Sequence, residues 1–309
     1  MNFKGKDIIS IKDFSKEEIN FVIEYATKML PYAKGEKYKD VLKGKVLSSL
    51  FFEPSTRTRL SFESAMNRLG GKVIGFSDPS GTSQKKGESL ADTIRMADSY
   101  SDIIVMRHPQ EGAARLAAEF ADAPVLNAGD GAGSHPTQCL LDLFTISTEK
   151  KRISKNNIVL LGDLKYGRTV HSLAYALSLY SANLTFVSPS SLKMPKEVIN
   201  ECIELGVEPN QTSNLEKAVK DADVLYATRI QKERFPDAEE YNHVVGTYII
   251  NNDLLKNAKK DLIIMHPLPR VTEIDPEVDS TTHALYFKQA FNGVPIRMAL
   301  LSLVTGGII

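Results

Sequence analysis

The sequence predicts an α/β protein of two doubly wound, parallel-sheet domains joined by interdomain helices. The chain has 309 residues, enough for about two domains of ~150 residues each. Short apolar runs of strand length alternate with amphipathic patterns of helical period, and this alternation restarts near residue 158 after a polar stretch at 149–157. We therefore expect one domain at 1–134 and a second at 135–289, with a C-terminal helix at about 290–309 packing back on the first.

The first series of elements begins at residues 45–52, where KVLSSLFF has the continuous apolar character of a buried parallel strand. A helical pattern starts at residue 55 and stops at Gly70-Gly71, because glycine commonly ends helices. The same reasoning predicts strands at 73–76, 102–106 and 124–126, and helices at 88–100 and 113–121. A Gly-rich loop at 127–134 then leads into a helix that starts near Pro136.

The second series repeats this order in the other half of the chain. Expected strands lie at 158–161, 184–187, 224–227 and 262–265, and expected helices at 170–180 and 196–205. A last helical pattern at 294–303 has no strand after it. Alternation of this kind indicates parallel sheets that helices cover on both faces.

Composition excludes several classes of protein. Lys plus Arg and Asp plus Glu are both 38, so the net charge is zero and a nucleic-acid or anionic-lipid surface is not expected. The sequence has no apolar run of 18 residues and no apolar leader near Met1, which predicts a cytoplasmic protein without a membrane span. Cys139 and Cys202 lie in separate helical patterns, and no histidine pair has metal-ligand spacing, so we expect neither metal nor cofactor.

Polar clusters follow the expected strands, where open α/β sheets bind their ligands. The richest, residues 55–59 (STRTR), combines three hydroxyls and two guanidiniums at a helix start, where N–H groups and the helix dipole favour an anion. A simple helix cap explains one of these hydroxyls and leaves the others unexplained. We therefore predict a phosphate site at this helix start.

Two further clusters have more than one interpretation. Residues 162–169 (GDLKYGRT) nearly match a nucleotide phosphate loop, but Arg168 replaces the lysine, and a planar guanidinium suits a carboxylate better. His135 stands between the Gly-rich loop and a helix start, where it is either structural or in contact with a ligand oxygen. His266, in HPLPR, fits a structural role in a loop that two prolines hold rigid.

Seven motifs follow one another along essentially the whole chain: FEPSTRTRLSFE at 52–63, KKGES at 85–89, MRHPQEGAAR at 106–115, HPTQ at 135–138, GDLKYGRTVHS at 162–172, TRIQKER at 228–234 and HPLPR at 266–270. In this order they resemble the aspartate and ornithine carbamoyltransferases, and the first is similar to that family's carbamoyl-phosphate motif. The resemblance implies a carbamoyl-phosphate-binding first domain, an aspartate-binding second domain, and transfer of the carbamoyl group of carbamoyl phosphate to L-aspartate in pyrimidine biosynthesis.

The resemblance also implies roles for individual residues. By this resemblance the phosphate is held by Ser55, Thr56, Arg57 and Thr58, and the carbonyl oxygen is held by Thr58, Arg107 and His135. The carbamoyl amide is held by Gln138 and by the backbone of Pro267, Leu268 and Pro269. The two carboxylates of aspartate are bound by Arg168, Arg229 and Gln231. The resemblance also implies that Ser83 and Lys86 come from a neighbouring subunit of a homotrimer, and that Lys86 contacts aspartate as well. The implied catalytic residues are Arg57, Thr58, Lys86, Arg107 and His135. Glu53 and Arg234 resemble the family's ion-pairing residues. The segments at 107–115 and 162–172 are most similar to those of catalytic chains that form a heterododecamer with a zinc-containing regulatory chain.

Three alternatives remain beside this interpretation. An ornithine carbamoyltransferase shares the phosphate motif, but that enzyme has a cysteine in the loop that corresponds to 266–270, where this chain has none, and it lacks the pair Arg229 and Gln231. A nucleotide-binding protein built on 162–169 leaves the other motifs unexplained. A non-catalytic relative would not need to keep every catalytic position.

Overall fold

The computed structural model describes all residues except 79–80, 231–238, 240, 242–243 and 308–309. The chain divides into two compact units. Unit 1 comprises residues 1–144 and 291–309, and unit 2 comprises residues 145–290. In the described part of the chain, each unit is built on one parallel sheet, which confirms the predicted fold class.

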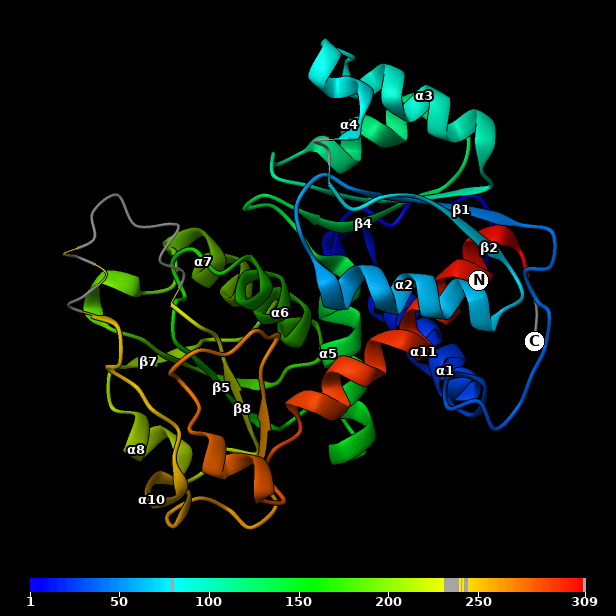
Figure 1. Ribbon diagram of the computed structural model, residues 1–309. Coiled ribbons are helices and arrows are strands. Elements are labelled where there is room, and N and C mark those ends of the chain that lie inside the picture. Colours follow the sequence, from blue (N-terminus) through cyan, green and yellow to red (C-terminus); the bar gives the residue numbers. More distant parts are fainter. Residues whose placement is uncertain (79–80, 231–238, 240, 242–243, 308–309) are drawn as a thin grey trace. The chain divides into compact units, whose positions relative to one another are not determined.

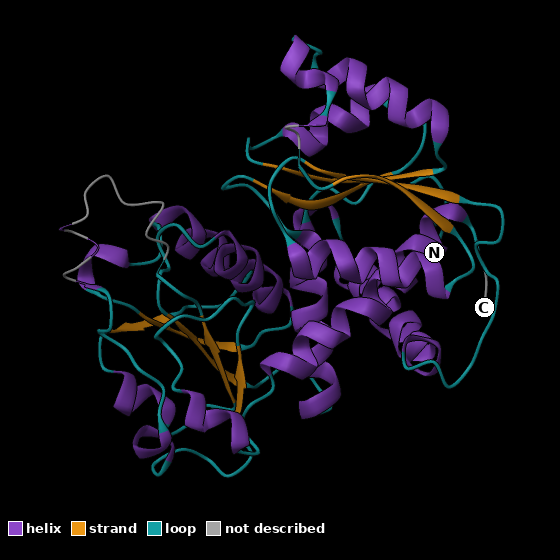
Figure 2. Ribbon diagram, viewed as in Figure 1, coloured by secondary structure: helices purple, strands orange, loops and turns teal. Residues whose placement is uncertain are grey.

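Unit 1 holds a sheet with the strand order β2-β1-β3-β4. The strands are β1 (Val46–Phe51), β2 (Lys72–Phe76), β3 (Ile103–His108) and β4 (Val125–Asp130). Helices α3 (Leu90–Tyr100) and α4 (Ala113–Phe120) cover one face, and α1 (Lys16–Ala33) and α2 (Thr56–Arg68) cover the other (Figures 1 and 2). The central strands β1 and β3 are buried along almost their whole length, as strands covered on both faces must be.

Unit 2 holds a sheet with the order β7-β6-β5-β8-β9. Its strands are β5 (Asn157–Leu161), β6 (Asn183–Val187), β7 (Asn210–Thr212), β8 (Val224–Ala227) and β9 (Ile263–Met265). Helices α6 (Arg168–Leu179) and α7 (Lys196–Glu204) lie on one face, with α8 (Leu215–Val219) and α10 (Asn252–Leu255) on the other (Figure 1). A core of Val, Leu and Ile side chains fills the space between the sheet and the α8–α10 face.

Two helices carry the chain between the units. Helix α5 (Pro136–Lys150) begins in unit 1 and ends in unit 2, and α11 (Tyr286–Thr305) begins in unit 2 and ends in unit 1. Helix α11 begins before the apolar pattern at 294–303. Its first turns also carry polar residues, so the apolar pattern did not reveal them.

The remaining differences from the predicted elements have local causes. Helix α1 was not predicted, although Ser15 and Glu18 form a capping box at its start. Residues 127–130 were predicted as part of a loop, but they continue β4 as buried backbone, because Asn127 and Asp130 find hydrogen-bond partners inside the fold. A short strand, β7, and the short helices α8 and α10 also lie outside the predicted set.

Candidate functional site

The first turn of α2 follows β1 and carries the predicted phosphate-binding residues. Ser55 occupies the N-cap position with extended backbone, yet among the described residues its side chain makes no capping hydrogen bond to the helix. Thr58 is buried at 7% exposure, while Thr56 and Arg57 are exposed. The helix N-terminus therefore offers N–H groups and hydroxyls to an outside acceptor.

Arg107 lies beside this helix start, at the carboxyl end of β3. Phe52 N–H donates to the Arg107 carbonyl at 2.9 Å, which places the segment leading to Ser55 next to Arg107. The guanidinium donates to Glu53 Oε1 from Nη2 at 2.5 Å and from Nε at 3.2 Å, and its Nη1 donates to the Ala128 carbonyl at 3.4 Å. The arginine is thus tied to the segment after β1 and to β4, at the edge where three strands end.

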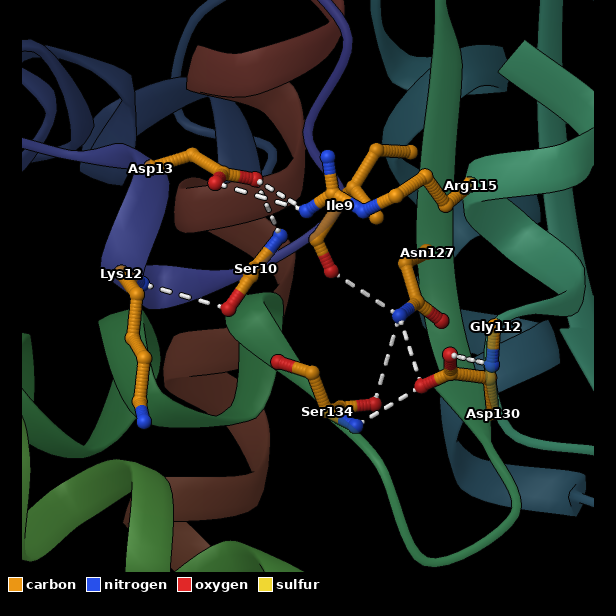
Figure 3. Close-up of polar contacts among 9 residues, drawn as sticks. All are labelled: Ile9, Ser10, Lys12, Asp13, Gly112, Arg115, Asn127, Asp130 and Ser134. Atoms are coloured by element: carbon orange, nitrogen blue, oxygen red, sulfur yellow. Dashed lines mark hydrogen bonds and ion pairs between the residues drawn. The ribbon is translucent and has the colours of Figure 1, made fainter. Parts of the chain in front are cut away.

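His135 follows a loop that a buried polar network holds in place (Figure 3). Asp130, 4% exposed, accepts hydrogen bonds from Ser134 N–H at 2.7 Å and Asn127 Nδ2 at 3.0 Å on Oδ1, and from Gly112 N–H at 2.9 Å on Oδ2. Asn127, fully buried, also donates to the Ile9 carbonyl at 3.0 Å. The network holds both ends of the loop before His135, and it ties the loop to the start of α4. Sequence reasoning assigned no role to Asn127 or Asp130, although polar residues that end an apolar run were a usable signal.

Helix α5 starts directly after His135, which is 4% exposed. The His135 carbonyl accepts from the N–H groups of Gln138 at 3.0 Å and Cys139 at 3.2 Å, so the histidine sits at the helix start. Gln138 is half-buried, and its Nε2 donates to Asp142 Oδ1 at 2.9 Å. Unit 1 therefore brings the α2 start, Arg107 and the His135–Gln138 segment to the carboxyl end of one sheet.

Ser83 and Lys86 lie on a short 3-10 helix, η3 (Ser83–Lys86). Both side chains are exposed in the single chain.

In unit 2, Arg229 follows β8 and Arg168 begins α6. Arg229 lines a hollow of about 450 Å³, counting the space that is open to solvent, and its other walls are Leu161, Gly162, Ala227, Thr228, Ile230, Tyr241, Val245, Gly246, Tyr248, Val271, Thr272 and Glu273. A Cβ at Gly162, where φ is +114°, would lie 2.3 Å from the Thr228 carbonyl, so glycine permits the loop after β5 to reach the end of β8. Gln231 and Arg234 fall outside the described residues.

The loop after β9 contains Pro267, Leu268 and Pro269. His266, 1% exposed, accepts from Leu268 N–H on Nδ1 at 2.8 Å, and its Nε2 lies 2.7 Å from Glu273 Oε1. Burial raises the pKa of Glu273, but the hydrogen bond from His266 together with backbone N–H donors outweighs it, and the net pKa falls below its ordinary value. These contacts agree with the structural role predicted for His266. They also orient the loop that contains the backbone of Pro267, Leu268 and Pro269, to which the resemblance assigns the carbamoyl amide.

Among the described residues, no three His, Cys, Asp or Glu side chains gather as a metal site. The thiols of Cys139 and Cys202 are buried and are not joined in a disulfide, and burial raises the pKa of both. No helix in the described ranges is long and apolar enough to cross a bilayer.

Comparison with known proteins places this geometry in a family. The model of the aspartate/ornithine carbamoyltransferase carbamoyl-P binding domain matches residues 6–148, and that of the Asp/Orn binding domain matches residues 154–304. The chain belongs to the aspartate/ornithine carbamoyltransferase family.

Its similar relatives share nearly the full length. The aspartate carbamoyltransferase catalytic subunit of Thermococcus kodakarensis is 61% identical over 306 residues, 99% of each chain. That of Methanosarcina barkeri is 55% identical over 308 residues, 100% of each chain. Among solved structures, the catalytic subunit of M. jannaschii aspartate transcarbamoylase has 52% identity and a TM-score of 0.91, covering 97% of this chain and 98% of its own. The Trypanosoma cruzi enzyme in complex with carbamoyl phosphate and aspartate has 42% identity and a TM-score of 0.92, covering 98% and 97%.

Proposed function

We propose that the chain transfers the carbamoyl group of carbamoyl phosphate to the amine of L-aspartate, giving N-carbamoyl-L-aspartate and phosphate for pyrimidine biosynthesis. The observation that carries the proposal is the edge of the unit 1 sheet, where the start of α2 lies beside Arg107. Together they present hydroxyl, N–H and guanidinium donors to one dianionic group. The full-length relatives named aspartate carbamoyltransferase support the same activity.

In this proposal unit 1 binds carbamoyl phosphate. The phosphate is held by Ser55, Thr56, Arg57 and Thr58, and the carbonyl oxygen by Thr58, Arg107 and His135. Negative charge develops on that oxygen when the amine attacks, so fixed donors there stabilise the transition state, and one such donor contributes about 10²–10³ in rate. Gln138 and the carbonyls of Pro267, Leu268 and Pro269 accept from the carbamoyl NH₂ group.

Unit 2 binds aspartate through Arg168, Arg229 and Gln231, with Lys86 of a neighbouring subunit as a further contact. A carbon–nitrogen bond forms between the aspartate amine and the carbamoyl carbon, and the carbon–oxygen bond to phosphate breaks. The departing phosphate takes the proton that the amine loses. Because carbamoyl phosphate is already activated, the reaction needs no covalent enzyme intermediate.

One assay separates this reaction from its alternatives. The purified chain is incubated with carbamoyl phosphate and either aspartate or ornithine, and released phosphate and carbamoylated product are both measured. We expect product with aspartate, because guanidinium groups at Arg168 and Arg229 suit a second carboxylate and repel the side-chain ammonium of ornithine. The proposal is contradicted if carbamoylated product forms with ornithine and not with aspartate, or if no product forms with either of them.

The proposed assembly is a cytoplasmic homotrimer in which Ser83 and Lys86 complete the neighbour's site, and it extends to a heterododecamer with a zinc-containing regulatory chain. The exposed position of η3 supports the shared site, since a polar surface segment is available to another chain. Inactive Lys86→Ala and His135→Ala variants are dissociated, mixed and reassembled. Activity should return, because some sites combine an intact Lys86 with an intact His135. A mixture that stays inactive, although mass measurement shows mixed trimers, excludes sharing.

The regulatory chain needs a separate test. Size-exclusion chromatography with light scattering measures the mass of the trimer with and without a zinc-loaded regulatory chain from a similar relative. A larger complex supports the heterododecamer, and an unchanged trimer contradicts it.

A further inference from the structure

A buried polar cluster lies directly behind Gln138, where α5 meets the middle of α11 in unit 1. Gln138 Nε2 donates to Oδ1 of Asp142, one helical turn further on, at 2.9 Å, and Asp142 is fully buried. Arg297, 3% exposed, donates from Nη2 to Thr137 Oγ1 at 3.2 Å. Its guanidinium also lies 4.9 Å from the centre of the buried Phe62 ring.

The fold makes room for this buried arginine. A Cβ at Gly293, one turn before Arg297 on α11, would lie 2.2 Å from Arg297 Nη1, so the guanidinium occupies the space of a missing side chain. Burial lowers the pKa of Arg297 to about 9, and the charge of Asp142 acts in the opposite direction. The guanidinium therefore remains protonated at neutral pH, and a buried cation requires a nearby anion.

The charge of Asp142 decides which way the Gln138 amide points. An amide has an oxygen on one side and an NH₂ group of almost the same size on the other, so shape alone does not orient it. An ionised carboxylate only accepts hydrogen bonds, and it therefore selects the NH₂ side. The oxygen of Gln138 is then left to face the opposite direction, from a half-buried position.

We propose that the Asp142 carboxylate, buried in the same cluster as Arg297, is a positioning residue that fixes the Gln138 amide so that its oxygen accepts from the NH₂ group of the donor substrate. The inference rests on the proposed function, and it adds a basis for specificity. In the reversed orientation two NH₂ groups would oppose each other. The fixed orientation favours a carbamoyl over an acetyl group, because a methyl group cannot donate to Gln138.

The test compares carbamoyl phosphate with acetyl phosphate, which carries a methyl group in place of NH₂. For Asp142→Asn, kcat/KM with carbamoyl phosphate and the inhibition constant of acetyl phosphate are measured with aspartate present. The asparagine can donate to the Gln138 oxygen and reverse the amide. We expect kcat/KM for carbamoyl phosphate to fall about 10–100-fold, with acetyl phosphate binding changed less than about threefold.

Controls separate positioning from general damage. Asp130→Asn alters another buried carboxylate of unit 1, and its dissociation constants for carbamoyl phosphate and acetyl phosphate, both measured without aspartate, should change by similar factors. In a Gln138→Ala background, Asp142→Asn should change discrimination no further, because the residue through which it acts is gone. If Asp142→Asn does not fold, Asp142→Asn combined with Arg297→Met removes both buried charges and should give the same loss of discrimination.

Equal effects on the two compounds, or the same loss of discrimination in the Gln138→Ala background, overturn the inference. Wild-type chain that does not carbamoylate aspartate refutes the proposed function instead, so the two failures are distinguishable.

Discussion

Asp130 offers a quantitative test of how the site is held. Its carboxylate accepts three hydrogen bonds, from Ser134 N–H, Asn127 Nδ2 and Gly112 N–H, at 2.7, 3.0 and 2.9 Å. Asp130→Asn keeps the shape but leaves one oxygen, so at least one N–H donor then faces an NH₂ group. The remaining hydrogen bonds also lose their charged acceptor.

The cost follows from these contacts. A hydrogen bond to a charged group contributes about 1.5–3 kcal/mol, and an unsatisfied buried donor costs about 1–3 kcal/mol. Gly112 is exposed and water can replace its partner, so the two contributions do not add in full, and we expect a loss of about 2–3 kcal/mol. At 1.4 kcal/mol per tenfold change, the population with an opened loop rises about 30–140-fold.

The assay combines unfolding with kinetics. Thermal unfolding of Asp130→Asn is followed by near-ultraviolet circular dichroism, and kcat is measured at saturating carbamoyl phosphate and aspartate. The melting temperature should fall, and kcat should fall about tenfold or more, because His135 directly follows the loop. Asp122→Asn, at an exposed carboxylate of the same unit, is the matched control. An Asp130→Asn chain that melts and turns over like Asp122→Asn refutes the argument.

Three further outcomes are expected. His135→Ala should lower kcat about 10²-fold or more with a smaller change in the KM for carbamoyl phosphate, and near-normal turnover would leave the histidine a structural role alone. Arg229→Ala should raise the KM for aspartate about 30-fold or more while carbamoyl phosphate binding, measured by calorimetry, is largely kept; equal weakening of both contradicts the assignment. Since the folded pKa of Glu273 is lowered, its contribution to stability is present above the unfolded pKa and is lost as pH falls through the folded value. Glu273→Gln should therefore be less stable than wild type at pH 7, with the difference in denaturant midpoint shrinking as pH falls below about 4; a constant difference excludes the charge of the Glu273 carboxylate as its source.

The sequence by itself determined the fold class and most of the elements around the site. The apolar runs that become β1, β3, β5 and β8 have strand length and little polar interruption, so local composition is sufficient to indicate buried parallel strands. Because parallel strands end at one edge of a sheet, the same runs also indicated that the STRT segment and Arg107 would meet. That meeting depends on strand direction and needs no knowledge of side-chain contacts.

The tertiary structure alone decided how the site residues are supported. Asn127 and Asp130 end an apolar run, but that pattern does not say that Ile9, Ser134 and Gly112 become their hydrogen-bond partners. Arg297 is 160 residues from Thr137 in sequence, and no periodicity predicts that the two side chains meet. A buried polar group must find its hydrogen bonds wherever the folded chain places them, so these contacts become visible only after the helices have packed.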